Sequence, residues 1–299
     1  MPILPIIAAL ILVGVPSLLA LMGIFRARTE PRAPAIAWDW RLAILSALLY
    51  TVAFNLVFFV QELFLVLPKA FTPGLQPTLF HNNHLWQGEH PLASLFQGTG
   101  ALATLLLGLL CLLLLQRDVR RSFAMRLFLL WLAYCGVFMA LPQVVVGALS
   151  SGSDVGMAME YLQLGATARN IAALLALASI PLLAREFARR LLGLAEVPAR
   201  LAGAAARSRF VFQVATLPGL LATVLILPYR VPRELLEVVF LPLVVFIAGM
   251  PWIQAGAWRL REVVATPRST VYTLAYPLAA ALVLLLAFQW LLRPGIAFF

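Results

Sequence analysis

The sequence predicts an all-α polytopic integral membrane protein with about eight transmembrane helices and both ends on the non-cytoplasmic side. Hydrophobic residues make up 63% of its 299 residues and charged residues only 11%, which is more apolar surface than one soluble core can bury. Apolar runs of about 20 residues, long enough to cross a hydrocarbon core as helices, recur along the chain. Arginines gather between alternate runs, as in loops that stay in the cytoplasm.

The apolar runs cover residues 3–25, 42–67, 92–115, 127–149, 167–183, 210–227, 235–258 and 271–292. The first run lacks a basic start and a small-residue cleavage site, so we expect a spanning helix there and not a signal peptide. The loops after the odd-numbered runs hold 17 of the 22 basic residues, and the other side holds five. This asymmetry places both ends on the non-cytoplasmic side.

The net charge of +10 does not indicate nucleic acid, because the arginines lie between apolar runs and not on one solvated face. The lipid bilayer is the expected partner. An arginine-rich composition with a single lysine favours a bacterial inner membrane. Cys111 and Cys135 both lie inside apolar runs, where a thiol behaves as a small buried hydrophobe.

The segment 185–209 mixes arginines with leucines, which predicts a basic amphipathic helix on the cytoplasmic leaflet. We expect it to link a membrane domain, residues 1–184, to a three-helix membrane domain, residues 210–299. The first domain holds nearly all the polar residues at membrane depth, so we expect function to reside there.

The second run carries Gln61 and Glu62 in an otherwise apolar segment, with Asn55 and Lys69 seven residues to either side of Glu62. That spacing puts Asn55, Glu62 and Lys69 on roughly one helical stripe. Glu62 is a candidate catalytic carboxylate, and a structural hydrogen bond to a neighbouring helix explains it equally well.

All three histidines, His81, His84 and His90, lie in the non-cytoplasmic loop 73–91. Neutral imidazoles bind zinc, so these residues are candidate metal ligands if the loop folds back. The alternative is an ordinary turn-rich loop in which Trp86 anchors the chain at the interface.

Further polar residues follow the fourth run. Ser153 or Asp154 suits the N-cap of a helix that starts near residue 155. Glu160, Gln163, Thr167 and Asn170 then recur at helical spacing, and such a stripe should face protein or water, either for interhelical hydrogen bonds or for catalysis. Topology gathers Glu62, the histidines and Asp154 at the non-cytoplasmic ends of their spans.

This arrangement resembles the core of the M50 (site-2-protease-like) intramembrane metallopeptidases. In that family one helix carries His-Glu-x-x-His, whose histidines bind zinc and whose glutamate is the general base. Here the motif corresponds to residues 61–65, the loop 73–91 follows, and residues 97–101 open the next helix as a small-residue segment. Asp154 lies where the resemblance implies a third ligand, and the similarity covers about residues 42–166.

The chain departs from the family at both histidines of the motif. Gln61 and Leu65 stand in their places, and leucine cannot bind a metal. The resemblance therefore implies a zinc site that is lost, or one rebuilt from His81, His84 and His90. We favour loss.

The sequence leaves three functional hypotheses open. The leading one is a proteolytically inactive M50-like protein that binds another membrane protein or an apolar ligand in a cleft between the second, fourth and fifth spans, without a cofactor. The second is a zinc-dependent hydrolase that uses the histidine loop, with Glu62 or Glu89 as base. The third is a small-solute or proton-coupled transporter with Glu62, Asp154 and Glu160 as carriers.

Overall fold

The computed structural model describes residues 3–30, 37–117, 122–232, 235–263, 265 and 273–298. Within this part of the chain, eight helices are long and apolar enough to span a membrane, as the sequence predicts. They cover Ile3–Thr29, Trp40–Ala70, Leu92–Gln116, Phe123–Leu149, Ala166–Leu192, Ala204–Arg230, Val238–Arg259 and Ala275–Leu292. The architecture is therefore that of a polytopic helical membrane protein, to which a small β-sheet is added.

The α-helices are α1 (Ile3–Ala9), α2 (Val15–Thr29), α3 (Trp40–Ala70), α4 (Leu92–Phe96), α5 (Thr99–Arg117), α6 (Phe123–Leu149), α7 (Asp154–Tyr161), α8 (Ala166–Leu192), α9 (Ala204–Val211), α10 (Leu217–Arg230), α11 (Leu235–Gly256) and α12 (Ala275–Leu286). π-Helical segments join α1 to α2 and α9 to α10, and another extends α12 to Leu292. The strands are β1 (Gln76–Leu79), β2 (His84–Gln87) and β3 (Ile296–Ala297).

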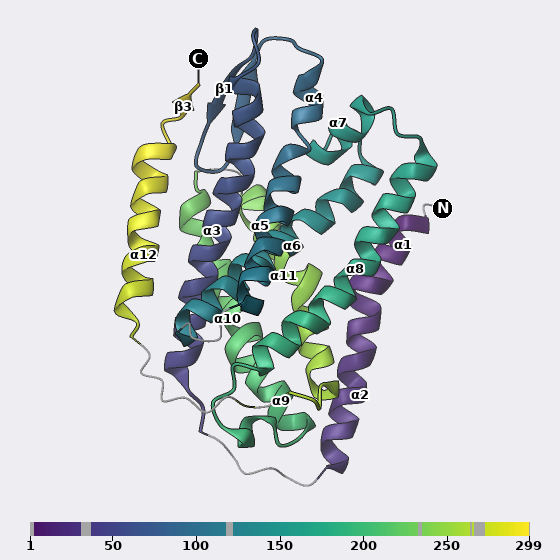
Figure 1. The fold of residues 1–299 in the computed structure, drawn as a ribbon, viewed down its shortest axis with the longest axis vertical. Coiled ribbons are helices and arrows are strands. Elements are labelled where there is room, and N and C mark those ends of the chain that lie inside the picture. The colour runs from purple at the N-terminus through teal and green to yellow at the C-terminus, as the bar shows by residue number, and fades with distance from the viewer. Residues whose placement is uncertain are drawn as a thin grey trace.

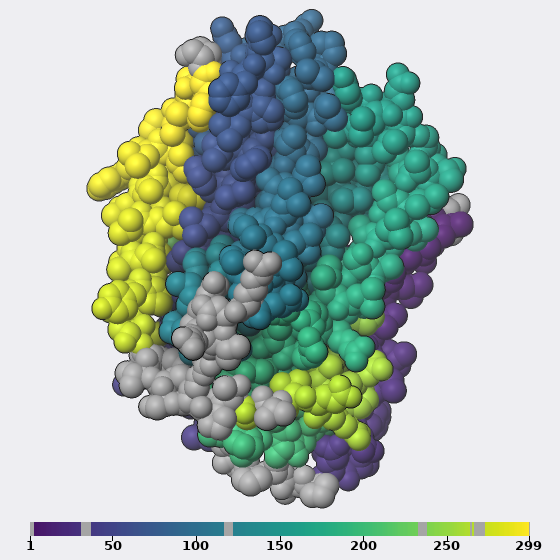
Figure 2. Space-filling view, viewed as in Figure 1, coloured from purple at the N-terminus to yellow at the C-terminus, as the bar shows by residue number. Residues whose placement is uncertain are grey.

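Helices α3 and α6 form the centre of the bundle. In each, 72% of the most apolar window is buried, against 11% for the span that contains α1 and α2 and 17% for the span that contains α12. These two outer spans lie on opposite sides of the bundle (Figures 1 and 2). Their exposed apolar side chains suit contact with lipid.

The two ends of the bundle differ in character. The β-sheet, α4 and α7 lie at one end, which we term the sheet end, and α9 with the last turns of α2 lies at the other (Figure 1). The last turns of α2 and α8 and the 3₁₀ turn Ala257–Arg259 after α11 bring arginines to this second end. We term it the arginine-rich end. Five basic residues that contribute to the sequence asymmetry lie outside the described residues: Arg32, Arg120, Arg121, Arg233 and Arg268. So do residues 271 and 272 of the predicted eighth span.

The segment 185–209 does not form the separate amphipathic helix that its composition predicts. Helix α8 continues to Leu192, a short 3₁₀ turn covers Pro198–Leu201, and α9 begins at Ala204. The physical reason is that Leu191 and Leu192 are 1% and 0% exposed, so these leucines pack in the bundle and not on a leaflet. One hydrophobic core also includes residues from both sides of this segment.

The loop after α3 is a β-hairpin. Strand β1 pairs with β2 and β3 in an antiparallel sheet of order β2-β1-β3. Because successive strand residues point to opposite faces, His84 and Trp86 face inward, whereas Leu85 and Gln87 are exposed. Strand alternation thus decides which histidine reaches the bundle.

Candidate functional site

The centre of the candidate site is a hydrogen bond between α3 and β2. The Glu62 carboxylate oxygen Oε2 lies 2.8 Å from Nδ1 of His84. Glu62 is 6% exposed and His84 is 8% exposed, so little water competes for this contact. The sequence predicted that these two residues lie at one end of the bundle, and the structure places them in direct contact.

Gln97 and Lys69 extend this contact into a cluster. Oε1 of Gln97 lies 3.1 Å from Nε2 of His84 and 3.4 Å from Nζ of Lys69. The Lys69 ammonium also donates to the Leu65 carbonyl at 2.7 Å and lies 4.7 Å from the centre of the Trp86 ring. We refer to Glu62, His84, Gln97 and Lys69 as the polar cluster.

Hydrogen-bond chemistry assigns the protons within the polar cluster. An ammonium can only donate, so the Gln97 atom that faces Lys69 must be the amide oxygen. The same oxygen faces Nε2 of His84, which must therefore carry a proton. A second proton then lies between Nδ1 and Glu62, held either by an imidazolium beside a carboxylate or by a carboxylic acid beside a neutral imidazole. The Glu62–His84 pair thus shares one proton.

Asp154 joins the polar cluster electrostatically from the start of α7. The helix is capped by Ser153, whose Oγ accepts from the Gly156 amide at 3.2 Å, so Asp154 is not needed as the cap. Burial raises the pKa of the Asp154 carboxyl group, the nearby His84 counteracts this, and Glu62 reinforces it. Asp154 therefore adds a second carboxyl group near the Glu62–His84 pair.

Positions 61 and 65, where the resemblance implies zinc ligands, are packed against α5. A Cβ on Gly100 would lie 2.8 Å from Cγ of Leu65 and 3.0 Å from the Gln61 carbonyl oxygen. The Gln61 side chain is engaged as well, since its Oε1 accepts from Nε2 of Gln143 at 2.8 Å. These contacts join α3 to α5 and α6 at the positions of the motif.

Asn55 lies deeper in α3 and does not belong to the polar cluster. It is 0% exposed, and its Nδ2 donates to the Thr51 carbonyl one turn earlier at 2.8 Å. The predicted stripe of Asn55, Glu62 and Lys69 is thus divided, because only its last two members reach the hairpin.

The hairpin separates the three histidines. Nε2 of His81 lies 3.0 Å from the Val231 carbonyl, and Nδ1 of His90 accepts from the Leu92 amide at 3.2 Å. Only His84 reaches the polar cluster, because β2 presents it inward while His81 precedes the strand and His90 follows it. Among the described residues, no three His, Cys, Asp or Glu side chains are grouped to hold a metal ion.

The predicted polar stripe on the fifth span is broken. Helix α7 ends at Tyr161 and α8 starts at Ala166, with Gln163 between them at a φ of +52°. Glu160, Gln163, Thr167 and Asn170 are all exposed, so they do not pack against a neighbouring helix, which was one of the two environments expected for the stripe. Glu160 instead pairs with Arg169, at 2.6 Å, on the surface near the sheet end.

Three members of the site were not among the candidate site residues of the sequence: Lys69, Gln97 and Gln143. Lys69 carried a signal, since it lies seven residues after Glu62 and is the chain's one lysine. No sequence signal distinguishes Gln97 and Gln143 from the other glutamines, because their hydrogen-bond partners come from other segments of the chain.

Comparisons of the chain with protein-family models, with curated proteins and with solved structures found no match.

Proposed function

We propose that this protein is a multi-pass membrane protein without proteolytic activity, which binds another membrane protein or an apolar ligand at its sheet end. The observation that carries the proposal is the buried contact between Glu62 and His84. A general base of an M50-like peptidase would face a metal-bound water, whereas this carboxylate is held by an imidazole.

The packing of α5 supports the loss of peptidase chemistry. Gly100 lies against Gln61 and Leu65, so apolar and amide contacts fill the positions of both ligands. A zinc site rebuilt from the histidine loop would need three converging imidazoles, and His81, His84 and His90 have separate partners. We therefore favour an M50-like protein that has become a binding protein.

Exposed apolar side chains near the polar cluster support binding. Phe71 is 84% exposed just after α3, Leu85 is 56% exposed on the outer face of β2, and Phe64 is 44% exposed on α3. Phe71 and Leu85 lie outside the spanning helices, where contact with acyl chains does not account for an exposed apolar side chain, and they suit an interaction surface. In this proposal the ligand contacts the apolar side chains and the polar cluster keeps the hairpin in position.

We further propose that the sheet end, with both chain termini, lies on the non-cytoplasmic side of a bacterial inner membrane. The support is the gathering of arginines at the opposite end, since basic residues near short loops are retained in the cytoplasm. Cysteine-labelling of a Gln87→Cys variant with a membrane-impermeant reagent tests this orientation. If this variant is labelled only after the membrane is permeabilised, the proposed orientation is reversed.

Elemental analysis combined with a peptidase assay tests the absence of proteolysis. The wild-type protein, reconstituted in liposomes with a model transmembrane peptide, should release no fragment and carry no stoichiometric zinc. Bound zinc together with cleavage that is lost in Glu62→Gln would overturn the proposal.

Photo-crosslinking tests the binding half of the proposal. A photoreactive residue at position 85 should crosslink to one defined membrane protein or apolar ligand, whereas one at position 282 should crosslink only to bulk lipid. Leu282, on α12, is a matched control because it is 53% exposed. Equal crosslinking from the two positions would contradict a specific surface at the sheet end.

The shared proton favours one alternative, a proton-coupled transporter of a small solute. Buried ionisable groups in membrane proteins often carry protons along a transport path, and the Glu62–His84 hydrogen bond holds one proton between two such groups. In this alternative Glu62 and Asp154 are the carriers, while Glu160, exposed and paired with Arg169, is not. Proton flux into liposomes that is abolished by Glu62→Gln and retained in Glu160→Gln would favour the transporter.

A further inference from the structure

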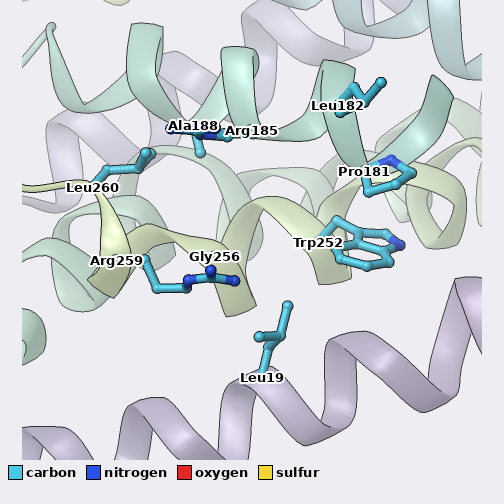
Figure 3. Close-up of a pocket in the computed structure, with 9 residues that line it drawn as sticks. All are labelled: Leu19, Pro181, Leu182, Arg185, Ala188, Trp252, Gly256, Arg259 and Leu260. Carbon is cyan, nitrogen blue, oxygen red and sulfur yellow. The ribbon is translucent and has the colours of Figure 1, made fainter. Parts of the chain in front are cut away.

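A pocket of about 360 Å³ lies at the arginine-rich end, far along the bundle from the polar cluster. Its walls come from three helices: Leu19 on α2, Leu182 and Arg185 on α8, and Trp252 on α11, with Arg259 just beyond α11. Figure 3 shows the side chains of Trp252 and Arg259 on one side of the pocket and those of α8 on the other, with Leu19 below. None of these residues takes part in the proposed function.

The pocket presents two cationic groups. Arg185 and Arg259 are both exposed, and neither side chain makes a hydrogen bond or ion pair with any other residue that the structure describes. A second hollow of about 470 Å³ shares both arginines and adds Glu186, Arg189, Arg261 and Glu262 to its lining. Glu186 is paired with Arg189 and Arg190, so the arginines of this hollow outnumber its carboxylates. Two guanidinium groups that form no ion pair with a described residue, in a concave site, suit the binding of an anion.

The rest of the pocket is apolar. Leu182 is 71% exposed on a helix able to span the membrane, so it faces lipid. The Trp252 ring is fixed, because its Nε1 donates to the Ile11 carbonyl at 2.8 Å. The anion that fits this site therefore carries an apolar tail that lies against Leu19, Leu182 and Trp252.

Both arginines lie near the ends of their spans, which is where lipid headgroups contact a membrane protein. Arg259 is the last residue of the span Val238–Arg259, and Arg185 lies in the last two turns of the span Ala166–Leu192. In Figure 2 the end of α11, in yellow-green, reaches the surface between α8 and α2 near the arginine-rich end. Basic pockets between spans at this level bind the headgroups of anionic lipids.

We propose that this pocket binds an anionic phospholipid, with its phosphate on Arg185 and Arg259 and an acyl chain along α2 and α8. The planar guanidinium fork suits two phosphate oxygens. A zwitterionic lipid carries its own counter-charge, so we expect it to bind less well. The proposal does not depend on the function of the sheet end.

Native mass spectrometry of the delipidated protein tests this proposal. The wild type in a mixture of phosphatidylglycerol, cardiolipin and phosphatidylcholine should retain the anionic lipids, with at least tenfold preference over phosphatidylcholine. Retention without preference would overturn the proposal, and this measurement needs no variant. Glycerol phosphate that displaces the lipid at equal concentration would also overturn it, because the site would then bind free phosphate.

A pair of double variants locates the bound lipid. Arg185→Gln with Arg259→Gln should lower the apparent affinity for phosphatidylglycerol at least tenfold. The matched control, Arg28→Gln with Arg41→Gln, removes the same charge from exposed arginines at the same end of the bundle and should leave the affinity within about twofold. Equal losses of affinity in the two double variants would show a general effect of charge and would refute lipid binding in this pocket.

Discussion

The Lys69 ammonium and the Gln97 amide oxygen lie 3.4 Å apart, and this contact decides the protonation of a third residue. Because an ammonium cannot accept a hydrogen bond, the amide oxygen must face both Lys69 and His84, so Nε2 of His84 carries a proton. The imidazole then turns Nδ1 toward Glu62, with a proton between them. Lys69, at the end of α3, thereby determines which hydrogen bond His84 makes to Glu62, which lies nearly two turns earlier in the same helix.

The polar cluster should be energetically coupled. We expect Glu62→Gln to destabilise the protein by about 1–3 kcal/mol, because it changes one partner of a buried hydrogen-bonded pair. His84→Ala should cost about 3–5 kcal/mol, since it leaves both Glu62 and Gln97 without their partner. Thermal unfolding in detergent measures both effects, and a double-mutant cycle should give a coupling energy of about 1 kcal/mol or more.

Glu160→Gln is the matched control for the coupling measurement. Glu160 also forms an ion pair, with Arg169, but its side chain is 65% exposed. Exposed pairs contribute little, so its stability should lie within about 0.5 kcal/mol of wild type. Additive effects of Glu62→Gln and His84→Ala would contradict the shared proton.

The close approach of α5 to α3 should make position 100 intolerant of a side chain. In Gly100→Ala the new methyl group meets Leu65 at 2.8 Å and the Gln61 backbone at 3.0 Å. Overpacking of this kind costs about 1–3 kcal/mol. Gly165→Ala is the control, since nothing lies within 4 Å of its added Cβ; equal Tm values for the two variants would show that the helices are further apart.

The eight spans were predictable because the length of an apolar run alone decides whether a helix can cross a bilayer. The meeting of Glu62 with the histidine loop was predictable in outline, since topology brings both to one end of the bundle. The choice of His84 was not, because it depends on the side-chain alternation of β2, a four-residue strand with polar residues at both ends, and Pro77 disguises its partner strand β1. The break in the stripe from Glu160 to Asn170 also escaped prediction, although Gly165 hinted at a turn.

Asp154 should make stability fall as the pH rises. Burial raises the pKa of its carboxyl group above the ordinary value, so the folded state favours the protonated form. Its contribution to stability is fully present below the ordinary pKa and is lost as the pH rises through the raised, folded-state pKa. Asp154→Asn removes the ionisation, so the variant should be more stable than wild type at neutral pH by roughly 0.5–2 kcal/mol.

Unfolding curves across the pH range check the role of Asp154. The difference in Tm between Asp154→Asn and wild type should grow from acidic to neutral pH. A constant difference would mean that the carboxyl group ionises alike in the folded and unfolded states. A variant that gains stability and loses ligand crosslinking at position 85 would assign Asp154 to the function of the sheet end.

Glu30 should have the opposite pH dependence at the arginine-rich end. Its Oε2 accepts from the Ala204 amide at 2.7 Å, and this hydrogen bond, together with the nearby Arg26, lowers the pKa of its carboxyl group. The contribution is present above the ordinary pKa and is lost as the pH falls through the lowered, folded-state pKa. Glu30→Ala should therefore lower the Tm at neutral pH and lower it less once the wild-type carboxylate is protonated.

The three histidines should differ in their effects on stability, which separates the present structure from a shared metal site. His84→Ala removes two contacts of the polar cluster, whereas His90→Ala removes only an acceptor for the Leu92 amide and should cost about 0.5–1.5 kcal/mol. A zinc site would instead make the single variants similarly damaging, because the loss of any ligand opens the site. It would also make the Tm of the wild type fall on addition of a strong chelator. If the histidines have only separate hydrogen-bond partners, the losses of stability should be unequal among His81→Ala, His84→Ala and His90→Ala. The chelator should then leave the Tm of the wild type unchanged.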